Sequence, residues 1–258
     1  MQLLLSPLLL ALLLLVFVIS PLQAGTSFTA TSHPHQSALL ELYTSEGCSS
    51  CPPADRWISQ VVKDEELELN VLALAFHVDY WDYIGWKDPF ASAQYTARQR
   101  ELAKDNRMRT IYTPGFFING LEARNTRGMI AQLQSDNQPP VALTLHLNVA
   151  LENDHYSLHL TTPAKLEDKH KLQFLVFEDD LASKVTRGEN SGHTLKHEHV
   201  VRYLSPILDF ASETQYKIPL APGWVSGNQG VAAIVKSSDG QYLQSVQIKL
   251  NKVEPAHN

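Results

Sequence analysis

Two cysteines, Cys48 and Cys51, are separated by two serines and are the only cysteines of the 258-residue chain. The thiolate is the reactive form of cysteine, and a pair this close can exchange a disulfide with another molecule. An apolar run at 38–43 precedes the pair and a helix-compatible stretch at 54–64 follows it. Unpaired N–H groups and the helix dipole favour an anion at a helix start. We therefore expect Cys48 to be the exposed, attacking thiol and Cys51 to be the shielded, resolving thiol.

The cysteine pair has two other interpretations. A structural disulfide would close a very small loop and would remove little entropy from the unfolded chain. Structural zinc needs about four ligands, and the chain has no second Cys-x-x-Cys. Soft thiolates suit Cu(I), to which His77 would add a nitrogen, and the tail offers His193, His197 and His199. We predict a redox-active dithiol with no cofactor and assign no metal ligand; metal handling stays the alternative.

The composition is that of an ordinary globular protein, with 44% hydrophobic and 19% charged residues. The length suits one large or two modest domains. The net charge of −6 argues against a surface that binds polyanions. Nucleic acid is therefore not an expected partner.

The first residues form a strongly apolar segment from 3 to 19, followed by the small residue Ala24. This pattern predicts a signal peptide over residues 1–24, and hence a periplasmic or secreted protein. No Lys or Arg precedes the segment, and its length approaches that of a membrane span. Whether the segment is removed or kept as an anchor stays open, so membrane contact is expected only if it is kept.

The next residues predict a leader and then alternating strands and helices. Residues 25–37 are polar and unpatterned, which indicates a flexible leader. The remaining pattern predicts a first domain over residues 38–138 in the order βαβαββα, with Ser92 as the N-cap of its second helix. Its expected strands are 38–45, 67–78 and a pair around the turn at 119–120; its expected helices are 51–65, 92–105 and 126–134.

The chain changes character at residues 135–140, where the sequence reads SDNQPP. Short alternating runs follow, with turn residues between them and little helical pattern, which is typical of an antiparallel sandwich. We therefore expect a β-sandwich-like domain over residues 139–258. Its predicted strands are 141–150, 155–161, 171–178, 198–203, 215–220, 230–236 and 241–249.

An aromatic loop at 77–91 includes Trp81, Tyr83 and Trp86. Because it leaves a central strand at the edge where the cysteine helix begins, it should lie beside the cysteines. It would then form one wall of a binding groove, or else pack as a small satellite core. His77, at the end of the strand, would tune the pKa of Cys48 or move protons.

The motifs GCSSC and TPGFFING together resemble the thioredoxin fold. The resemblance implies a cis peptide bond between Thr113 and Pro114, with Pro114 shaping the groove for substrate backbone and Thr113 contacting the thiols. It also implies a thioredoxin-like fold for the first domain. Together with the alternating runs after residue 140, this predicts the fold class: an α/β thioredoxin-like domain followed by an all-β, sandwich-like domain.

The chain is still more similar to a family of exported bacterial thioredoxin-like proteins of unassigned function. The shared stretches are ELYTSEGCSSCPPAD, HVDYWDYIGWKDPF, YTPGFFING, RGENSGHTL and VVR. The resemblance implies the fold and export, and the cysteine pair predicts the activity, that of a thiol–disulfide oxidoreductase acting on envelope protein thiols or disulfides. A metal-handling protein, for copper or another metal, and a non-catalytic envelope binding module are the alternatives.

Overall fold

The computed structural model describes residues 26–63, 69–124, 126–134, 139–166, 170–225 and 227–250. The signal peptide predicted at 1–24 lies outside these residues. Within them, every helix is too short or too polar to cross a membrane.

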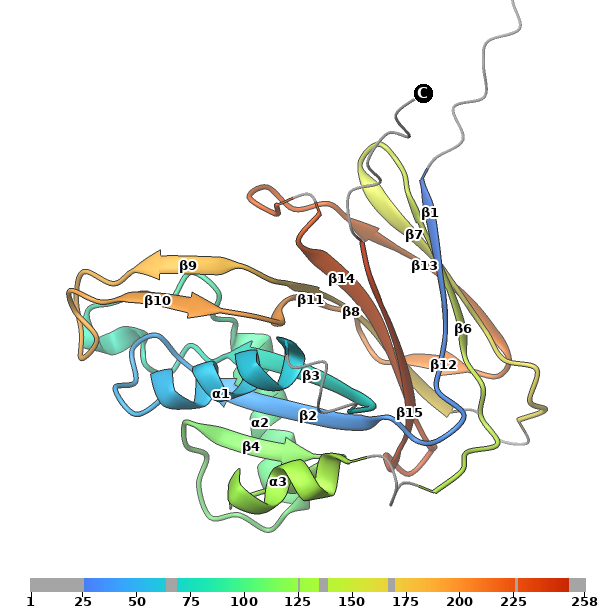
Figure 1. The fold of residues 1–258 in the computed structure, drawn as a ribbon, viewed down its shortest axis with the longest axis horizontal. Helices are drawn as coiled ribbons and strands as arrows, with labels where there is room; N and C mark the ends of the chain where they lie inside the picture. The colour runs from blue at the N-terminus through green and yellow to red at the C-terminus, as the bar shows by residue number, and fades with distance from the viewer. Residues whose placement is uncertain are drawn as a thin grey trace, which may run out of the picture.

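Strands are the commonest elements of the described structure, which also has three α-helices and one short 3-10 helix (Figure 1). In chain order, the elements are β1 (Ser27–Thr31), β2 (Ala38–Thr44), α1 (Pro52–Lys63), β3 (Val71–His77), the 3-10 helix η2 (Asp82–Ile84), α2 (Ala93–Asp105), β4 (Gly115–Ile118), β5 (Leu121–Glu122), α3 (Thr126–Leu133), β6 (His146–Leu151), β7 (His155–Thr161), β8 (His170–Glu178), β9 (Leu181–Lys184), β10 (Thr194–His197), β11 (Val200–Leu204), β12 (Leu208–Phe210), β13 (Glu213–Pro219), β14 (Gln229–Lys236) and β15 (Tyr242–Lys249).

The largest sheet has nine strands in the order β15-β14-β8-β11-β3-β2-β4-β5, with β12 paired to β8. Strand β3 pairs in parallel with β2 on one side and with β11 on the other. Nearly all residues of β2 and β3 are buried, as their continuous apolar sequences indicate for strands covered on both faces. The sheet therefore runs from the first half of the chain into the second without a break.

A second sheet, in the order β1-β6-β7-β13, packs against part of the nine-stranded sheet. Inward-facing residues alternate along β7, and Leu158 and Leu160 meet Phe174 and Val231 of the larger sheet. Strand β1 lies within the stretch predicted to be a flexible leader, and that prediction is wrong for residues 27–31. Its pairing partner, β6, lies far along the chain, so the local sequence carries no sign of the pairing.

Helices cover the two faces of the large sheet. Helices α1 and α3 pack on one face, where Ile58 and Met129 contact the strands. Helix α2 packs on the other face and is capped by Ser92, whose side chain accepts a hydrogen bond from the backbone N–H of Gln94. The core under α2 also contains Phe177 of β8, so it is shared by both halves of the chain.

The predicted fold class, an α/β thioredoxin-like domain followed by an all-β domain, is wrong. The protein is mainly β, with several sheets and few helices, and its largest sheet contains strands from both sides of the predicted boundary at residue 138. The alternating runs do form strands, but β8 and β14 become central strands of the large sheet. Almost every residue of β14 is buried, which is typical of a strand covered on both faces.

A two-stranded hairpin of β9 and β10 continues β8 and β11 beyond the large sheet and lies next to α1 (Figure 1). The chain bends at both ends of the hairpin, where Asp180 and His199 have positive φ angles of 55° and 50°. Such angles are uncommon for residues other than glycine. The bends direct the hairpin, and the loop 185–193 at its tip, toward the cysteines.

Candidate functional site

Cys48 and Cys51 form a disulfide immediately before α1. Pro52 and Pro53 begin the helix, where proline costs no hydrogen bond because the first N–H groups have no partner within a helix. Both cysteines are buried, with exposed fractions of 1% and 0%. The expectation that Cys48 would be exposed does not hold for the disulfide form, although the next residues, Ser49 and Ser50, are exposed.

Short contacts surround the Cys48 side of the disulfide. The hydroxyl of Ser50 lies 3.3 Å from Cys48 Sγ. On the other side, a Cβ added to Gly47 would lie 2.9 Å from Cβ of Trp81, so the aromatic loop packs directly on the residue before Cys48. Trp81 Nε1 also donates to Thr113 Oγ1 at 2.7 Å, and the Thr113–Pro114 peptide bond is cis. The aromatic loop thus joins the cysteine loop to the proline loop.

The tip loop 185–193 covers the cysteine loop from the hairpin. Asn190 is buried, and its Nδ2 donates to the carbonyl oxygens of Glu46 and Cys48 at 2.8 and 2.9 Å. The exposed carboxylate of Glu189 accepts from the N–H of Ser49 at 3.0 Å. Two side chains of the tip loop therefore bond the cysteine loop, the buried Asn190 and the exposed Glu189.

Glu46 is fully buried, and its hydrogen bonds connect several segments to the cysteine loop. One carboxylate oxygen accepts from Trp86 Nε1 at 2.8 Å, and the other accepts from His197 Nε2 of β10 at 3.0 Å. The backbone N–H of Glu46 donates to Asp88 at 2.8 Å. A buried carboxylate is tolerated only when it is bonded in this way.

His77 and Asp88 form a fully buried ion pair, with 2.7 Å between Nδ1 and Oδ2. Burial alone would lower the pKa of His77, but the charge and hydrogen bond of Asp88 outweigh it and raise this pKa above 6.5. Burial alone would raise the pKa of Asp88, but His77 outweighs it, and this pKa falls below 3.8. His77 is therefore held as a partner of Asp88 rather than of a cysteine.

Asp55, one turn after Cys51 on α1, is also buried. Burial raises the pKa of its carboxyl, while His197 and His77 oppose the rise. Its Oδ2 lies 4.0 Å from His197 Nδ1, and its Oδ1 has no hydrogen-bond partner among the described residues. Asp55 is joined to Cys51 through the backbone, because its N–H donates to the carbonyl oxygen of Cys51 at 3.1 Å.

The predicted aromatic site residues have different environments. Trp81 and Trp86 are partly buried and hydrogen-bonded to the proline loop and to Glu46, whereas Tyr83 is 82% exposed. Trp81 packs against the core under α2, and Trp86 is bonded to the buried Glu46 beside the cysteine loop. Of the three, Tyr83 is the side chain with most of its surface free to contact another molecule.

The tail histidines do not form one site. His197 contacts Glu46, His199 contacts the carbonyl oxygen of Ala73, and His193 contacts the backbone of Asn190. Within the described residues, His, Cys, Asp and Glu side chains form no group of three or more that would hold a metal ion.

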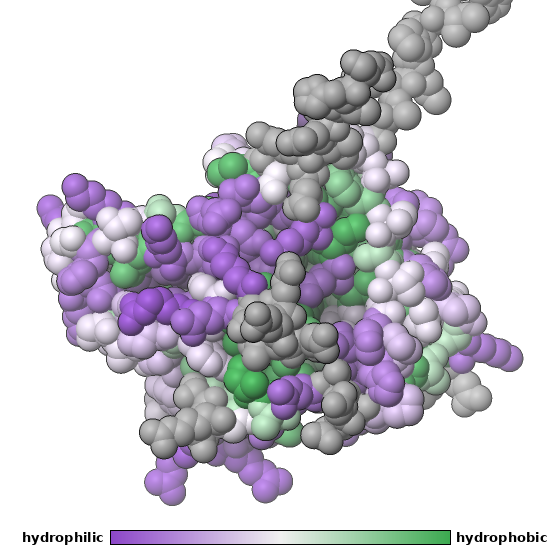
Figure 2. Space-filling model, viewed as in Figure 1, coloured by the Kyte–Doolittle hydropathy of each residue, from purple (hydrophilic) through white to green (hydrophobic). Residues whose placement is uncertain are grey.

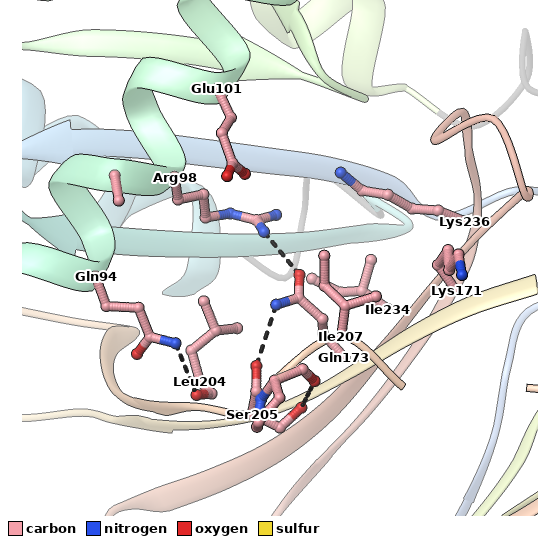
Figure 3. A pocket seen from close by; sticks show the side chains of 12 residues that line it. Gln94, Arg98, Glu101, Lys171, Gln173, Leu204, Ser205, Ile207, Ile234 and Lys236 are labelled. Atoms are coloured by element: carbon pink, nitrogen blue, oxygen red, sulfur yellow. Dashed lines mark hydrogen bonds between the residues drawn. The ribbon is translucent and has the colours of Figure 1, made fainter. Parts of the chain in front are cut away.

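A separate pocket of about 250 Å³ lies between α2 and the strands on the face opposite α1 (Figure 3). Arg98 enters it from α2, pairs with the buried Glu41 at 2.7 Å, and donates to Gln173 at 2.9 Å. Lys171 at its rim pairs with Asp209. Arg98 and Lys171 are therefore already paired with carboxylates, and we place the candidate site at the disulfide instead.

The fold and the site define a mainly β protein with a disulfide at the start of a helix, covered by a hairpin loop. The chain belongs to the DUF1223 family of proteins of unknown function, whose profile matches residues 39–236. No curated protein matches the chain. These comparisons do not support membership of the thioredoxin-fold superfamily.

Two solved structures share the overall fold. A protein of Agrobacterium tumefaciens from a structural genomics project has 22% sequence identity and a TM-score of 0.62, and the match covers 88% of this chain and 100% of that one. The second structure, HBP35 of Porphyromonas gingivalis, has 17% identity and a TM-score of 0.58, over 88% of this chain and 79% of that one. At these identities the likeness concerns the fold alone.

The sequence interpretation missed the buried acids Glu46, Asp55 and Asp88. The spacing of Asp55 from Cys51 and Ile58 would have placed it on the buried face of the helix. The role of Asn190 had no comparable signal, because its partners lie more than 140 residues away.

Proposed function

We propose that this protein is an exported thiol–disulfide oxidoreductase that uses the Cys48–Cys51 pair. The observation that carries the proposal is the disulfide itself, formed by the only two cysteines at the start of a helix. A loop this short constrains the unfolded chain by about 2 kcal/mol, less than the roughly 3 kcal/mol of a 15-residue loop. Reinforcement of the fold is therefore a weak reason for the bond.

The reaction proceeds by two exchanges. A thiolate of the client attacks Cys48 Sγ, the bond to Cys51 breaks, and Cys51 leaves as a thiolate that takes up a proton. A second client thiolate then attacks the client sulfur of the mixed disulfide and releases Cys48. The client loses two electrons and the Cys48–Cys51 pair gains them; the reverse sequence reduces a client disulfide.

The surrounding side chains have separate roles in this reaction. The Ser50 hydroxyl is placed to donate to a Cys48 thiolate, which lowers its pKa. Asp55, which is buried and follows Cys51 by four residues, is the acid that we assign to proton exchange with that thiol. The apolar segment at 3–19 supports export, and the proposed clients are thiols or disulfides of periplasmic or secreted proteins.

Trapping with single-cysteine variants tests the proposal. Cys51→Ala should accumulate a mixed disulfide through Cys48 with a cystine-containing peptide, because the resolving thiol is gone, whereas Cys48→Ala should trap none. The reduction potential, measured in dithiothreitol buffers, should lie above about −300 mV. A potential well below that value, with no adduct from either variant, would make the bond structural. Stoichiometric copper in the purified reduced protein would instead favour metal handling.

A further inference from the structure

The pocket under α2 contains one cation that has no ionic partner. Lys236, the last residue of β14, extends into the pocket toward Arg98 of α2 (Figure 3). Among the described residues, its ammonium takes part in no hydrogen bond and no ion pair. The other two cations that line the pocket are both paired with carboxylates. Lys236 is therefore the lining cation that a ligand can still pair with.

The surroundings of Lys236 disfavour its positive charge. Burial lowers the pKa of its ammonium below 10.5, and the charge of Arg98 lowers this pKa further. The carboxylates of Glu41, Asp105 and Glu101 oppose the fall without cancelling it. Because a lysine that loses part of its water is normally paired with an anion, an anion bound beside Lys236 would stabilise its charged form.

Aliphatic side chains form a large part of the remaining lining. One of them, Ile207, is 61% exposed, which few large apolar side chains of the described residues are. Covering such a side chain with an apolar group contributes about 25 cal/mol for each Å² removed from water. A ligand of this pocket should therefore join an anionic end to an apolar body. The apolar residues of the lining are Ala97, Leu204, Pro206, Ile207 and Ile234.

The charges and the size of the pocket limit the anion to a small group of single charge. Glu101 also lines the pocket, and its exposed carboxylate would repel a dianion such as phosphate more than a monoanion. Strong phosphate sites use several charged donors, whereas Lys236 is the one lining cation without an ionic partner among the described residues. The volume of about 250 Å³ lies below the roughly 300 Å³ of the smallest drug-sized sites. A carboxylate with a short aliphatic chain meets these conditions.

We propose that this pocket binds a carboxylic acid with an aliphatic body, whose carboxylate pairs with Lys236 and whose body packs on Ile207 and Ile234. The carboxylate has two sources, a free small acid or the C-terminus of a peptide that ends in an aliphatic residue. The pocket and α1 lie on opposite faces of the large sheet, so the inference goes beyond the proposed exchange reaction and does not depend on it. Figure 2 shows the molecule from the side of α1, with a mainly hydrophilic surface at the end that bears the hairpin, and the pocket lies behind the sheet in this view.

Two pairs of probes test the charge and the source of the carboxylate. Isocaproate represents the free acid, and isocaproamide has nearly the same shape without the charge. The tripeptide N-acetyl-Ala-Ala-Leu represents a peptide C-terminus, and its C-terminal amide is the neutral control. Calorimetric titration of the full chain should show saturable binding of at least one acid and about tenfold weaker binding of its amide, because the amide cannot form an ion pair with Lys236. Binding of the tripeptide acid alone would identify the C-terminus as the source, and binding of isocaproate would identify the free acid.

Variants with opposite expected effects assign the site. Lys236→Met keeps the length of the side chain without its charge and should weaken binding of the acid about tenfold or more, with no fall in melting temperature. Glu101→Gln should strengthen binding about two- to fivefold, because a carboxylate that competes for Lys236 is removed. Lys104→Gln is the matched control, since Lys104 is an exposed cation of α2 outside the pocket, and it should leave binding nearly unchanged. Binding should also shift the methyl resonances of Ile207 and Ile234.

Four results would overturn the inference. These are no saturable binding of either acid, equal binding of the amides, equal weakening by Lys104→Gln and Lys236→Met, or weaker binding after Glu101→Gln. Binding without disulfide exchange would refute the proposed function and leave the carboxylate site. Exchange without binding would refute the carboxylate site alone.

Discussion

Replacing Asp88 by Asn should destabilise the protein strongly, because Asp88 is the buried partner of His77. Removing one member of a fully buried ion pair leaves the other without compensation and costs about 3–5 kcal/mol. Asparagine keeps one acceptor, so the N–H of Glu46 or of Phe90 can still be bonded, but not the charge of His77. For a protein of this size, the loss corresponds to a fall in melting temperature of about 6–20 °C.

The predicted loss of stability depends on pH, and the two pKa shifts fix the direction of that dependence. Because the pKa of His77 is raised, its contribution to the free energy of unfolding is complete below pH 6.5. This contribution is lost as pH rises through the folded pKa. Because the pKa of Asp88 is lowered, its contribution to the free energy of unfolding is complete above pH 3.8. This contribution is lost as pH falls through the folded pKa. The difference in unfolding free energy between the two proteins should therefore be largest between about pH 4 and 6.5 and should shrink at higher pH.

Urea unfolding of both proteins at a series of pH values measures this difference. Asp154→Asn is the matched control, because Asp154 also lies 2.7 Å from a histidine, His155, but is 88% exposed. Exposed ion pairs contribute little to the free energy of unfolding, so this variant should unfold at nearly the wild-type urea concentration. A control effect as large as that of Asp88→Asn, or a difference that does not change with pH, would refute the role of burial.

Three smaller perturbations have similarly defined outcomes. Ser50→Ala should raise the pKa of the reduced Cys48 thiol, seen as slower alkylation at mildly acidic pH, because the thiolate loses a donor. Trp81→Phe should cost about 1 kcal/mol in urea unfolding, since the indole no longer donates to Thr113. Gly230→Ala should cost at least about 1–3 kcal/mol, because the new Cβ would overlap an aromatic ring of β8, and calorimetry should show a lower melting temperature.

Local patterns in the sequence were good guides to single elements. The apolar runs of β2 and β3, the serine cap of α2 and the alternation of β7 each depend on residues close together in the chain. The disulfide also joins neighbours. These features could be predicted because their physical causes are local.

The arrangement of these elements was not predictable in the same way. Strand β11 joins β3 through a short parallel contact at Val200, and that contact merges the two halves into one sheet. The pairing of β11 with β3 also explains the burial of Glu46 and the contacts of Asn190. Strand β10 and the tip loop are continuous with β11, and they bring His197 and Asn190 to the cysteine loop. Charged side chains such as Glu46 normally lie at the surface, so their type gave no reason to place them in the core.

The cover over the disulfide has a consequence for the order of events during synthesis. Asn190 is 142 residues further along the chain than Cys48, so the cysteine loop emerges from the ribosome long before the residues that cover it. Contacts between residues so far apart form slowly, and chains of this size often pass through partly folded states. A nascent chain therefore carries an uncovered cysteine pair, and completing the large sheet closes over it. Oxidation of the pair should accordingly be fastest before folding ends.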